Sequence, residues 1–288
     1  MSISKLFAEK SVVFSFEIFP PKRDSSIDTI WNTLEQLEGL GPDFISVTYG
    51  AGGGGGKSYT AQIAGAIRRK YGILPLAHLT CVNSTREEIR QSLADLREEG
   101  VEDILALRGD RVPGVEPKTD FLHASDLVTF IREEGGFSLS GACYPEVHTE
   151  APDPVTDVLN LKKKVDAGAE HLISQLFFDN AAFYAFVERA RIAGITVPIE
   201  AGIMPVVNAR QITRMVSLCG ASLPQKFVRM ISRYEGNPAA LRDAGIAYAV
   251  DQIVDLIAQG VEGIHLYTMN DPDVARRISG AVENLRKA

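Results

Sequence analysis

The stretch Ser11–Gly41, "SVVFSFEIFPPKRDSSIDTIWNTLEQLEGLG", carries one strand signal and one helix signal. Its first nine residues are rich in β-branched and aromatic side chains and stop at Pro20-Pro21, which predicts a strand over residues 11–19. From residue 26 onward, apolar residues recur at helical spacing and the segment ends in glycine, which predicts a helix. The apolar face consists of Ile27, Ile30, Leu34 and Leu37. Ser11–Gly41 is therefore one βα unit.

The same pattern recurs along the rest of the chain. Further strands are predicted at "FISVTYG" (44–50), "LPLAHLT" (74–80), "DILALRGD" (103–110), "FSLSGACYP" (137–145), "HLISQLFFD" (171–179), "PIEAGIMP" (198–205) and "GIHLYT" (263–268). Helices are predicted over residues 59–71, 86–99, 125–134, 155–167, 181–193 and 209–218, and after the eighth strand. An extra helix is predicted over about 239–258, before the last strand.

Strict alternation of strands and helices predicts a parallel sheet, because parallel neighbours need a crossover connection and helices provide it. Eight units without an obvious linker favour a closed barrel over two open sheets. We therefore predict an α/β protein with one domain over residues 1–288, a (β/α)8 TIM barrel with an extra helix before the last strand. In such a barrel the active site lies where the strands give way to their loops.

Composition excludes several classes of protein. Hydrophobic residues make up 45% of the chain and charged residues 23%, as in soluble globular proteins. The net charge of -7 gives no electrostatic basis for binding nucleic acid or an anionic membrane. No segment approaches the roughly 20 apolar residues of a membrane span, and the start lacks a signal-peptide core, so we expect a cytoplasmic protein. Cys81, Cys143 and Cys219 show no paired spacing, and no metal site is expected.

The predicted strand ends are unusually polar. They carry Glu17, Thr48, His78, Arg108 with Asp110, Tyr144, Gln175, Met204 and Tyr267. Glu17 is flanked by phenylalanines in "FSFEIFPP", where burial disfavours an unpaired carboxylate. A carboxyl group that is held neutral can deliver a proton near pH 7. The alternative is a structural carboxylate that pairs with an Arg or Lys of a neighbouring strand.

The stretch "TYGAGGGGGKSYT", Thr48–Thr60, fits a relaxed P-loop pattern in which Ala51 replaces the first glycine and Gly56-Lys57-Ser58 follows. A P-loop would place Lys57 on phosphates and Ser58 on magnesium. No convincing acidic partner for the magnesium ion follows a later strand. The glycines also suit a loop whose backbone lies close to a flat ring.

Ten strings in the chain together resemble the motifs of the methylenetetrahydrofolate reductase family. They are "FSFEIFPPK", "SVTYGAGG", "HLTC", "LALRGD", "ASDLV", "YPEVH", "LKKKVDAGA", "ISQLFFD", "AGIMPV" and "IHLYTMN", between about Phe14 and Asn270. The resemblance implies an eight-stranded barrel that carries FAD and uses NADH or NADPH to reduce 5,10-methylenetetrahydrofolate to 5-methyltetrahydrofolate, in one-carbon metabolism and methionine supply. It also implies that Thr48–Thr60 contains a loop that approaches the flavin.

The resemblance assigns four residues to the chemistry and to the folate. Glu17 matches the general acid, which helps to open the five-membered ring of the folate. Asp110 matches a carboxylate beside flavin and folate, where negative charge stabilises a developing cation. Gln175 matches a glutamine that hydrogen-bonds the pterin ring, and Gln211 matches another glutamine on the substrate side.

The resemblance also implies a set of FAD-binding residues. They are Thr48, Tyr49, Ala51, His78, Arg108, Gly109, Asp110, Ala124, Tyr144, His148, Asp157, Asn160 and Lys164. Arg108 and Lys164 suit the pyrophosphate, and Asp157 can accept hydrogen bonds from ribose hydroxyls.

The chain departs from the family pattern at Met215, Asp271, His123 and the Gly52–Gly56 run, which bears on donor and cofactor binding. Three alternatives stay open: a barrel that takes electrons through a redox partner protein, a P-loop nucleotide-binding protein, and a non-catalytic scaffold. The sequence also leaves open a homo-oligomer and the choice between NADH and NADPH.

Overall fold

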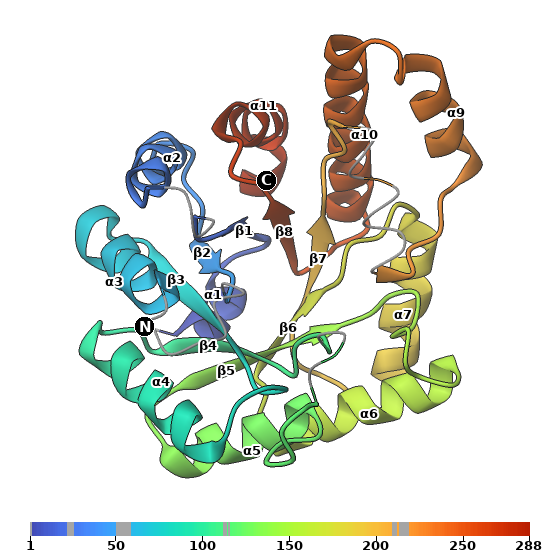
Figure 1. The fold of residues 1–288 in the computed structure, drawn as a ribbon. Helices are drawn as coiled ribbons and strands as arrows, with labels where there is room; N and C mark the ends of the chain where they lie inside the picture. Colours follow the sequence, from blue (N-terminus) through green and yellow to red (C-terminus); the bar gives the residue numbers. More distant parts are fainter. Residues whose placement is uncertain are drawn as a thin grey trace.

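Eight parallel strands close into one barrel in the order of the sequence, in a computed structural model that describes residues 2–21, 26–49, 59–111, 114, 116–208, 212 and 219–288 (Figure 1). The strands are β1 (Val13–Ile18), β2 (Phe44–Val47), β3 (Leu74–Thr80), β4 (Asp103–Leu107), β5 (Ser138–Cys143), β6 (His171–Ser174), β7 (Ile199–Ile203) and β8 (Gly263–Tyr267). The predicted barrel is confirmed.

Helices follow the strands, and most of them cover the outside of the barrel (Figure 1). They are α2 (Asp28–Glu38), α3 (Tyr59–Tyr71), α4 (Arg86–Glu98), α5 (Ala124–Glu134), α6 (Pro154–Ala167), α7 (Asn180–Ile192), α9 (Gln225–Tyr234), α10 (Pro238–Ala258) and α11 (Pro272–Val282), followed by a short 3-10 helix, η1 (Leu285–Lys287). The extra helix predicted before the last strand is α10. Most of the helix predicted over 209–218 lies outside the described residues.

Alternation along β1 separates the main core from the barrel interior. Phe14, Phe16 and Ile18 are buried in the hydrophobic cluster that the strands share with the surrounding helices. Because successive side chains of a strand point to opposite faces, Ser15 and Glu17 point into the barrel. The hydrophobic run around Glu17 therefore belongs to the outer face of the strand, and the carboxyl group belongs to the interior.

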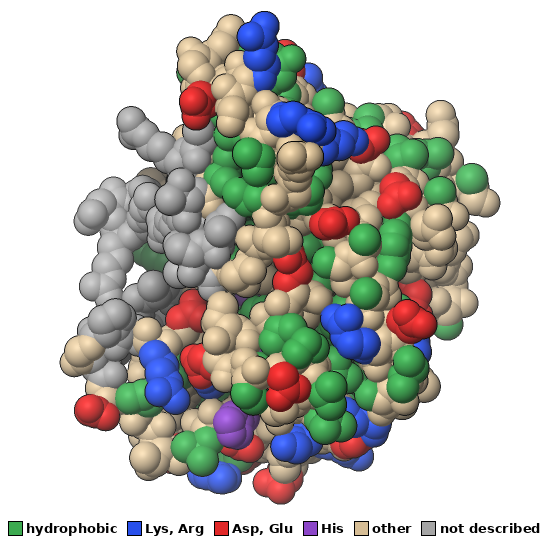
Figure 2. Space-filling model, turned by 90° about the vertical axis from the view of Figure 1, so that its right-hand side faces the viewer, with side chains coloured by type: hydrophobic (Ala, Val, Ile, Leu, Met, Phe, Trp, Pro, Cys, Tyr) green, Lys and Arg blue, Asp and Glu red, His purple; other side chains and the backbone are tan. Residues whose placement is uncertain are grey.

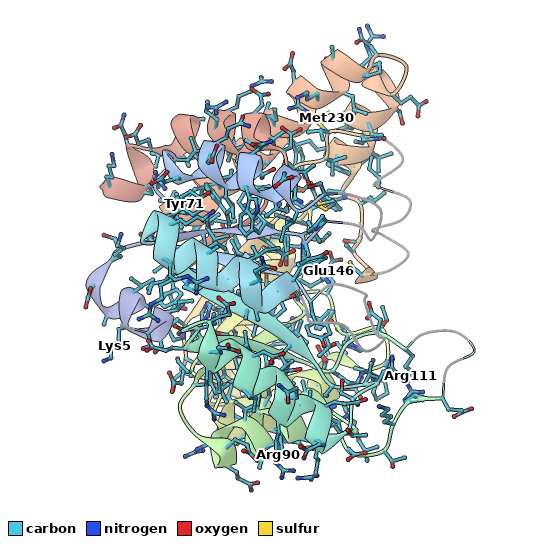
Figure 3. All side chains as sticks on the ribbon, turned by 60° about the vertical axis from the view of Figure 1, so that its left-hand side comes forward. Lys5, Tyr71, Arg90, Arg111, Glu146 and Met230 are labelled. Atoms are coloured by element: carbon cyan, nitrogen blue, oxygen red, sulfur yellow. The ribbon has the colours of Figure 1, made fainter. Side chains whose placement is uncertain are left out.

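A short helix that the sequence analysis did not predict, α1 (Ile3–Glu9), covers the amino-terminal end of the barrel. Ile3 and Leu6 join a cluster of interior side chains at that end of the strands. The backbone N–H of Ile3 donates to Asp103 Oδ1 at 2.9 Å, so a buried carboxylate of β4 holds the start of the helix. Figure 3 shows Lys5 of α1 at one end of the molecule and Arg111 and Glu146 at the other.

A second unpredicted helix, α9, packs with α10 and extends beyond the barrel (Figure 1). The ring of Phe227 stacks on Phe178, with 4.3 Å between ring centroids, in a small separate cluster. On the face drawn in Figure 2, which lies on this side of the molecule, Lys and Arg side chains are interspersed with Asp and Glu. None of the helices in the described part of the chain is long and apolar enough to cross a membrane.

Candidate active site

A pocket of about 1470 Å³ opens at the carboxyl ends of the strands. Seven of the polar strand-end residues singled out in the sequence line it. They are Glu17, His78, Arg108 with Asp110, Tyr144, Gln175 and Tyr267. The volume is large for a drug-sized ligand and suits a dinucleotide together with a second small molecule. The barrel therefore presents its polar side chains at the end where (β/α)8 enzymes carry their active sites.

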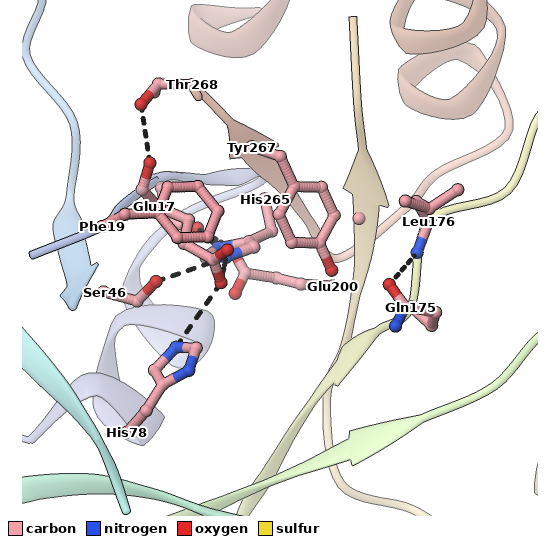
Figure 4. Close-up of polar contacts among 12 residues, drawn as sticks. Glu17, Phe19, Ser46, His78, Gln175, Leu176, Glu200, His265, Tyr267 and Thr268 are labelled. Carbon is pink, nitrogen blue, oxygen red and sulfur yellow. Dashed lines mark hydrogen bonds and ion pairs between the residues drawn. The ribbon is translucent and has the colours of Figure 1, made fainter. Parts of the chain in front are cut away.

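Glu17 lies at the bottom of this pocket and is only 6% exposed. Its Oε2 is 3.5 Å from the Nε2 atoms of both His78 and His265 (Figure 4). Its backbone carbonyl accepts a hydrogen bond of 2.6 Å from Thr268 Oγ1, which fixes the end of β1 against β8. Among the described residues, the carboxyl group forms ion pairs only with these two imidazoles, so the Arg or Lys partner of the structural alternative is not found there.

His78 of β3 presents a buried nitrogen to the pocket. Burial lowers its pKa to about 4, against the opposing effect of Glu17, so the ring is neutral at pH 7. Its Nε2 makes no hydrogen bond to any residue that the structure describes. Since buried polar atoms are nearly always satisfied, an orphan nitrogen at a pocket wall is a candidate contact for a ligand.

Tyr267 of β8 forms the wall next to Glu17. Its hydroxyl donates to the carbonyl oxygen of Ser174 at 2.8 Å, and burial raises its pKa well above the usual value. The ring lies over Gly202, where a Cβ atom would come within 2.9 Å of the ring and 2.2 Å of the Ser174 oxygen. Glycine at this position of β7 therefore leaves room both for the Tyr267 ring and for the Ser174 carbonyl group that the ring hydroxyl binds.

Two cations predicted to meet the pyrophosphate both line the pocket. The guanidinium of Arg108 donates to both carboxylate oxygens of Glu150, at 2.6 and 2.7 Å. This bidentate pair holds the pKa of Glu150 at about 2. Lys164 Nζ donates to the carbonyl oxygen of Ala142 at 2.5 Å, and burial lowers its pKa. Gly141 leaves room for the lysine stem, which a Cβ atom there would approach to 2.6 Å.

An aromatic and acidic group borders these cations. The rings of Tyr144 and His148 meet edge to face with 4.6 Å between centroids. The backbone N–H of His148 donates to Asp157 Oδ2 at 3.3 Å. Burial raises the pKa of Asp157 and of Tyr144, and it lowers that of His148. Asp157 therefore presents a partly desolvated carboxyl group that can accept hydrogen bonds from a ligand.

The remaining predicted site residues fall into three groups. The pocket lining includes Tyr49, Gly109, Asp110, Ala124, Asn160 and Gln175, besides the residues described above. Thr48 is not among the lining residues, and its carbonyl oxygen accepts a hydrogen bond from Thr60 Oγ1 at 3.0 Å. Ala51, Gln211, Met215 and the Gly52–Gly56 run lie outside the described residues. Their predicted roles, like those of the residues in the pocket, stay predictions.

Three residues near the site were not assigned a role from the sequence. His265 lies two residues before Tyr267, so strand alternation brings both to the interior and could have identified it. Glu150 follows "YPEVH" by two residues and carries no signal of its partner, Arg108. Asp271 caps α11 and forms a bidentate pair with Arg242 at 2.8 and 2.9 Å, so its carboxylate is engaged away from the pocket lining.

The donor set fits a flavin dinucleotide better than a metal ion. Arg108, Lys164 and Asp157 supply two cations and one acceptor around the same pocket, and His78 offers an unsatisfied nitrogen. Within the described ranges, no group of three or more His, Cys, Asp or Glu residues could hold a metal ion.

Fold and pocket together define a (β/α)8 barrel of the enzyme type, with its site at the carboxyl ends of the strands. The family model for methylenetetrahydrofolate reductase matches residues 2–283. The chain belongs to this family of oxidoreductases, as the ten motifs predicted.

Relatives with similar sequence identity to this chain occur in bacteria and plants. The chain is 38% identical over 265 residues to 5,10-methylenetetrahydrofolate reductase of Escherichia coli (strain K12), which covers 92% of this chain and 88% of that protein. It is 34% identical over 283 residues to "Methylenetetrahydrofolate reductase (NADH) 1" of Arabidopsis thaliana, which covers 93% of this chain and 48% of the plant protein.

A solved structure shares the fold at lower sequence identity. An uncharacterized protein from Clostridium thermocellum, which binds two copies of 5-methyl-5,6,7,8-tetrahydrofolic acid, matches with a TM-score of 0.66 and 17% identity. The match covers 99% of this chain and 98% of that one, and it concerns the fold.

Proposed function

We propose that the chain, as one catalytic unit over residues 1–288, uses bound FAD and a reduced nicotinamide to reduce 5,10-methylenetetrahydrofolate to 5-methyltetrahydrofolate. The observation that carries the proposal is a buried carboxyl group, Glu17, at the bottom of a pocket of about 1470 Å³ that also contains cations and hydrogen-bond acceptors suited to a dinucleotide. Family membership supports the reaction, and the plant relative named for NADH supports the donor.

Glu17 would act as the proton donor. Its buried carboxyl group faces two imidazoles, one of which is neutral at pH 7 because burial lowers its pKa to about 4. Neither imidazole supplies the full opposing charge that an Arg or Lys would. A carboxyl group so placed can hold a proton and deliver it to a ring nitrogen of the methylene-bridged folate, which opens the five-membered ring.

Asp110 and Gln175 would orient the substrate and balance its charge. Asp110 is exposed at the pocket, where a carboxylate favours the cation that forms when the ring opens. Gln175 accepts a hydrogen bond of 2.9 Å from the N–H of Leu176 through Oε1, which fixes the side-chain amide at the pocket wall (Figure 4). The amide N–H groups then point to where a pterin acceptor can lie.

Arg108 and Lys164 would hold the pyrophosphate of FAD, and Asp157 would accept from its ribose. To bind phosphate with the same bidentate fork, Arg108 would exchange Glu150 for phosphate, since that carboxylate already accepts from both of its Nη atoms. When bound, FAD supplies the hydride that reduces the opened one-carbon unit. The nicotinamide and the folate would enter the same pocket in turn.

The direct test is the absorbance of the purified protein during anaerobic addition of NADH. A yellow chromophore that bleaches with NADH and recovers with methylenetetrahydrofolate is the expected result. If dithionite bleaches the flavin but neither NADH nor NADPH does, the protein takes its electrons from a redox partner protein. A colourless protein that binds ATP with magnesium would refute the proposal.

Glu17→Gln tests the acid itself. The amide keeps the size of the side chain but cannot donate an acidic proton, so folate reduction is expected to fall by about 10²- to 10⁴-fold, the usual contribution of general acid catalysis. Reduction of the flavin by NADH should be retained, because hydride transfer to the flavin does not need this proton. Glu98→Gln, on the exposed surface of α4, is the control. Normal folate turnover by Glu17→Gln would exclude the acid role.

A further inference from the structure

A chain of buried polar side chains continues from Glu17 down the inside of the barrel. His265 Nε2 lies 3.5 Å from Glu17 Oε2, and His265 Nδ1 lies 2.6 Å from Ser15 Oγ. Ser15 Oγ donates to Glu200 Oε1 at 2.9 Å. These residues come from β8, β1 and β7, and Ser15, Glu200 and His265 are each 0% exposed.

This series of buried side chains ends in a second pair of a carboxyl group and an imidazole, which does not line the pocket. His171 Nε2 is 3.0 Å from Glu200 Oε2, and His171 Nδ1 is 3.0 Å from Ser140 Oγ. Phe7 of α1 packs on the ring of His171, with 4.7 Å between centroids, so the helix that covers the end of the barrel also covers this pair. A Cβ atom on Gly263 would come within 2.5 Å of Glu200 Cγ, so a glycine of β8 makes room for the acid.

The hydrogen bonds fix where the protons lie. A serine hydroxyl has one proton, and the proton of Ser15 is committed to Glu200. The Ser15 oxygen must then accept from His265, so His265 carries its proton on Nδ1. In the neutral ring the lone pair on Nε2 faces Ser46 Oγ at 3.4 Å and Glu17 Oε2 at 3.5 Å (Figure 4).

This arrangement has a consequence for Glu17. A lone pair of an imidazole that faces an ionised carboxylate brings two acceptors together, which is unfavourable in a buried site. A proton on Glu17 removes the conflict, because the carboxyl group can then donate toward Nε2 of His265. The opposite tautomer, with the proton on Nε2, would favour the ionised form of Glu17.

We propose that Glu200 is a positioning residue for Glu17: it draws the Ser15 proton to itself and thereby holds His265 as the Nδ1–H tautomer, whose Nε2 can accept a hydrogen bond from a proton-bearing oxygen of Glu17. The inference rests on the proposed function for its catalytic meaning, and the tautomer can be measured without folate. The titratable groups that face Glu17 are His78 of β3 and His265 and Tyr267 of β8, and Glu200 faces His171 of β6.

Two matched serine variants distinguish the contacts on the two sides of Glu200: Ser15 links Glu200 to His265, and Ser140 contacts His171. Ser15→Ala removes the acceptor for the Nδ1 proton of His265, so the ring is expected to change to the Nε2–H tautomer. Ser140→Ala removes a serine from the far side of Glu200 and leaves the link between Glu200, Ser15 and His265 in place. The tautomer of His265 should then be that of the wild type.

A double variant tests Glu200 itself. Glu200→Met combined with His171→Phe replaces the buried pair by apolar side chains of similar size, a change that buried ion pairs often tolerate. Ser15 is then free to donate its proton to Nδ1 of His265, and the Nε2–H tautomer is again expected. Should this variant fail to fold, the two serine variants decide the question.

The tautomer is read from the ring ¹⁵N shifts of the FAD-loaded enzyme labelled with ¹⁵N-histidine, whose five histidines are assigned by replacing each in turn. Single-turnover measurements of the two half-reactions follow. Ser15→Ala and the double variant should reduce folate about tenfold more slowly, part of what general acid catalysis contributes. Flavin reduction by NADH, and both half-reactions in Ser140→Ala, should be unchanged.

Either of two results overturns the inference: an Nε2–H tautomer of His265 in the wild type, or an Nδ1–H tautomer that persists in Ser15→Ala and the double variant. A wild-type enzyme that shows the Nδ1–H tautomer but does not reduce methylenetetrahydrofolate would instead refute the proposed function. The two failures are therefore distinguishable.

Discussion

Replacing Glu150 by glutamine is expected to strengthen FAD binding, although Glu150 lines the pocket. The carboxylate holds the guanidinium of Arg108 by two hydrogen bonds of 2.6 and 2.7 Å. In the proposed complex the same guanidinium binds the pyrophosphate, so the carboxylate and the cofactor compete for it. A carboxylate beside the pyrophosphate would also repel it.

The magnitude follows from the exposure of the pair. The side chains of Arg108 and Glu150 are 17% and 48% exposed, so solvent screens much of their attraction. Pairs of this kind contribute up to about 1 kcal/mol despite good geometry. Releasing about 1 kcal/mol of competition strengthens binding by about fivefold.

The measurement is a fluorescence titration of the flavin-free Glu150→Gln protein with FAD. Glu134→Gln is the matched control, because Glu134 pairs with Arg90 at 2.9 Å outside the pocket. The pKa of Glu150 is about 2, below its usual value of 4.5. The pair therefore persists above about pH 4.5 and is lost as the pH falls toward 2, so the effect should be constant from pH 6 to pH 8. Weaker FAD binding by Glu150→Gln would refute the competition.

Three further results are expected. Gly109→Ala should reduce the free energy of unfolding in urea by about 1–2 kcal/mol, because the backbone has φ +86° and the new Cβ would lie 3.1 Å from Thr80 Cβ; unchanged stability would contradict this. Burial raises the pKa of Asp103 from 3.8 to about 6, so the free energy of unfolding should fall as the pH rises through this range and the buried group ionises. In Asp103→Asn, the free energy of unfolding measured between pH 4 and pH 7 should lack this contribution to the decrease. Burial raises the pKa of Cys81 to about 12, so an aromatic disulfide reagent should label it only after unfolding.

Local patterns predicted most of the barrel because strands and helices alternate with strong periodicity. The helix expected over residues 59–71 is α3, and the strand at 74–80 is β3. The two unpredicted helices depend on distant contacts. The seven residues of α1 are held by Asp103 and by interior side chains of other strands. The α9 helix is held by Phe227 on Phe178, which its own sequence cannot indicate.

In the candidate site, too, local sequence patterns predict some features and contacts between distant residues determine the others. Strand ends can be recognised in the sequence, so the sequence alone places Glu17, His78 and Gln175 at one end of the barrel, where the pocket lies. Partnerships between strands could not be, because Ser15 and Glu200 are 185 positions apart. The role of Asp271 was also beyond sequence analysis, since its pairing with Arg242 depends on how α10 packs beside α11.

The helix that covers the amino-terminal end of the barrel has a consequence for biosynthesis. Ile3 is translated 100 positions before Asp103, its hydrogen-bond partner, and Ser4 is translated 166 positions before Glu170. During synthesis on the ribosome, this amphipathic segment therefore lacks its contacts with the barrel until β1 to β4 have emerged. A nascent chain arrested before β6 would display Ile3 and Leu6 to chaperones and proteases, and release of the full-length polypeptide would withdraw them.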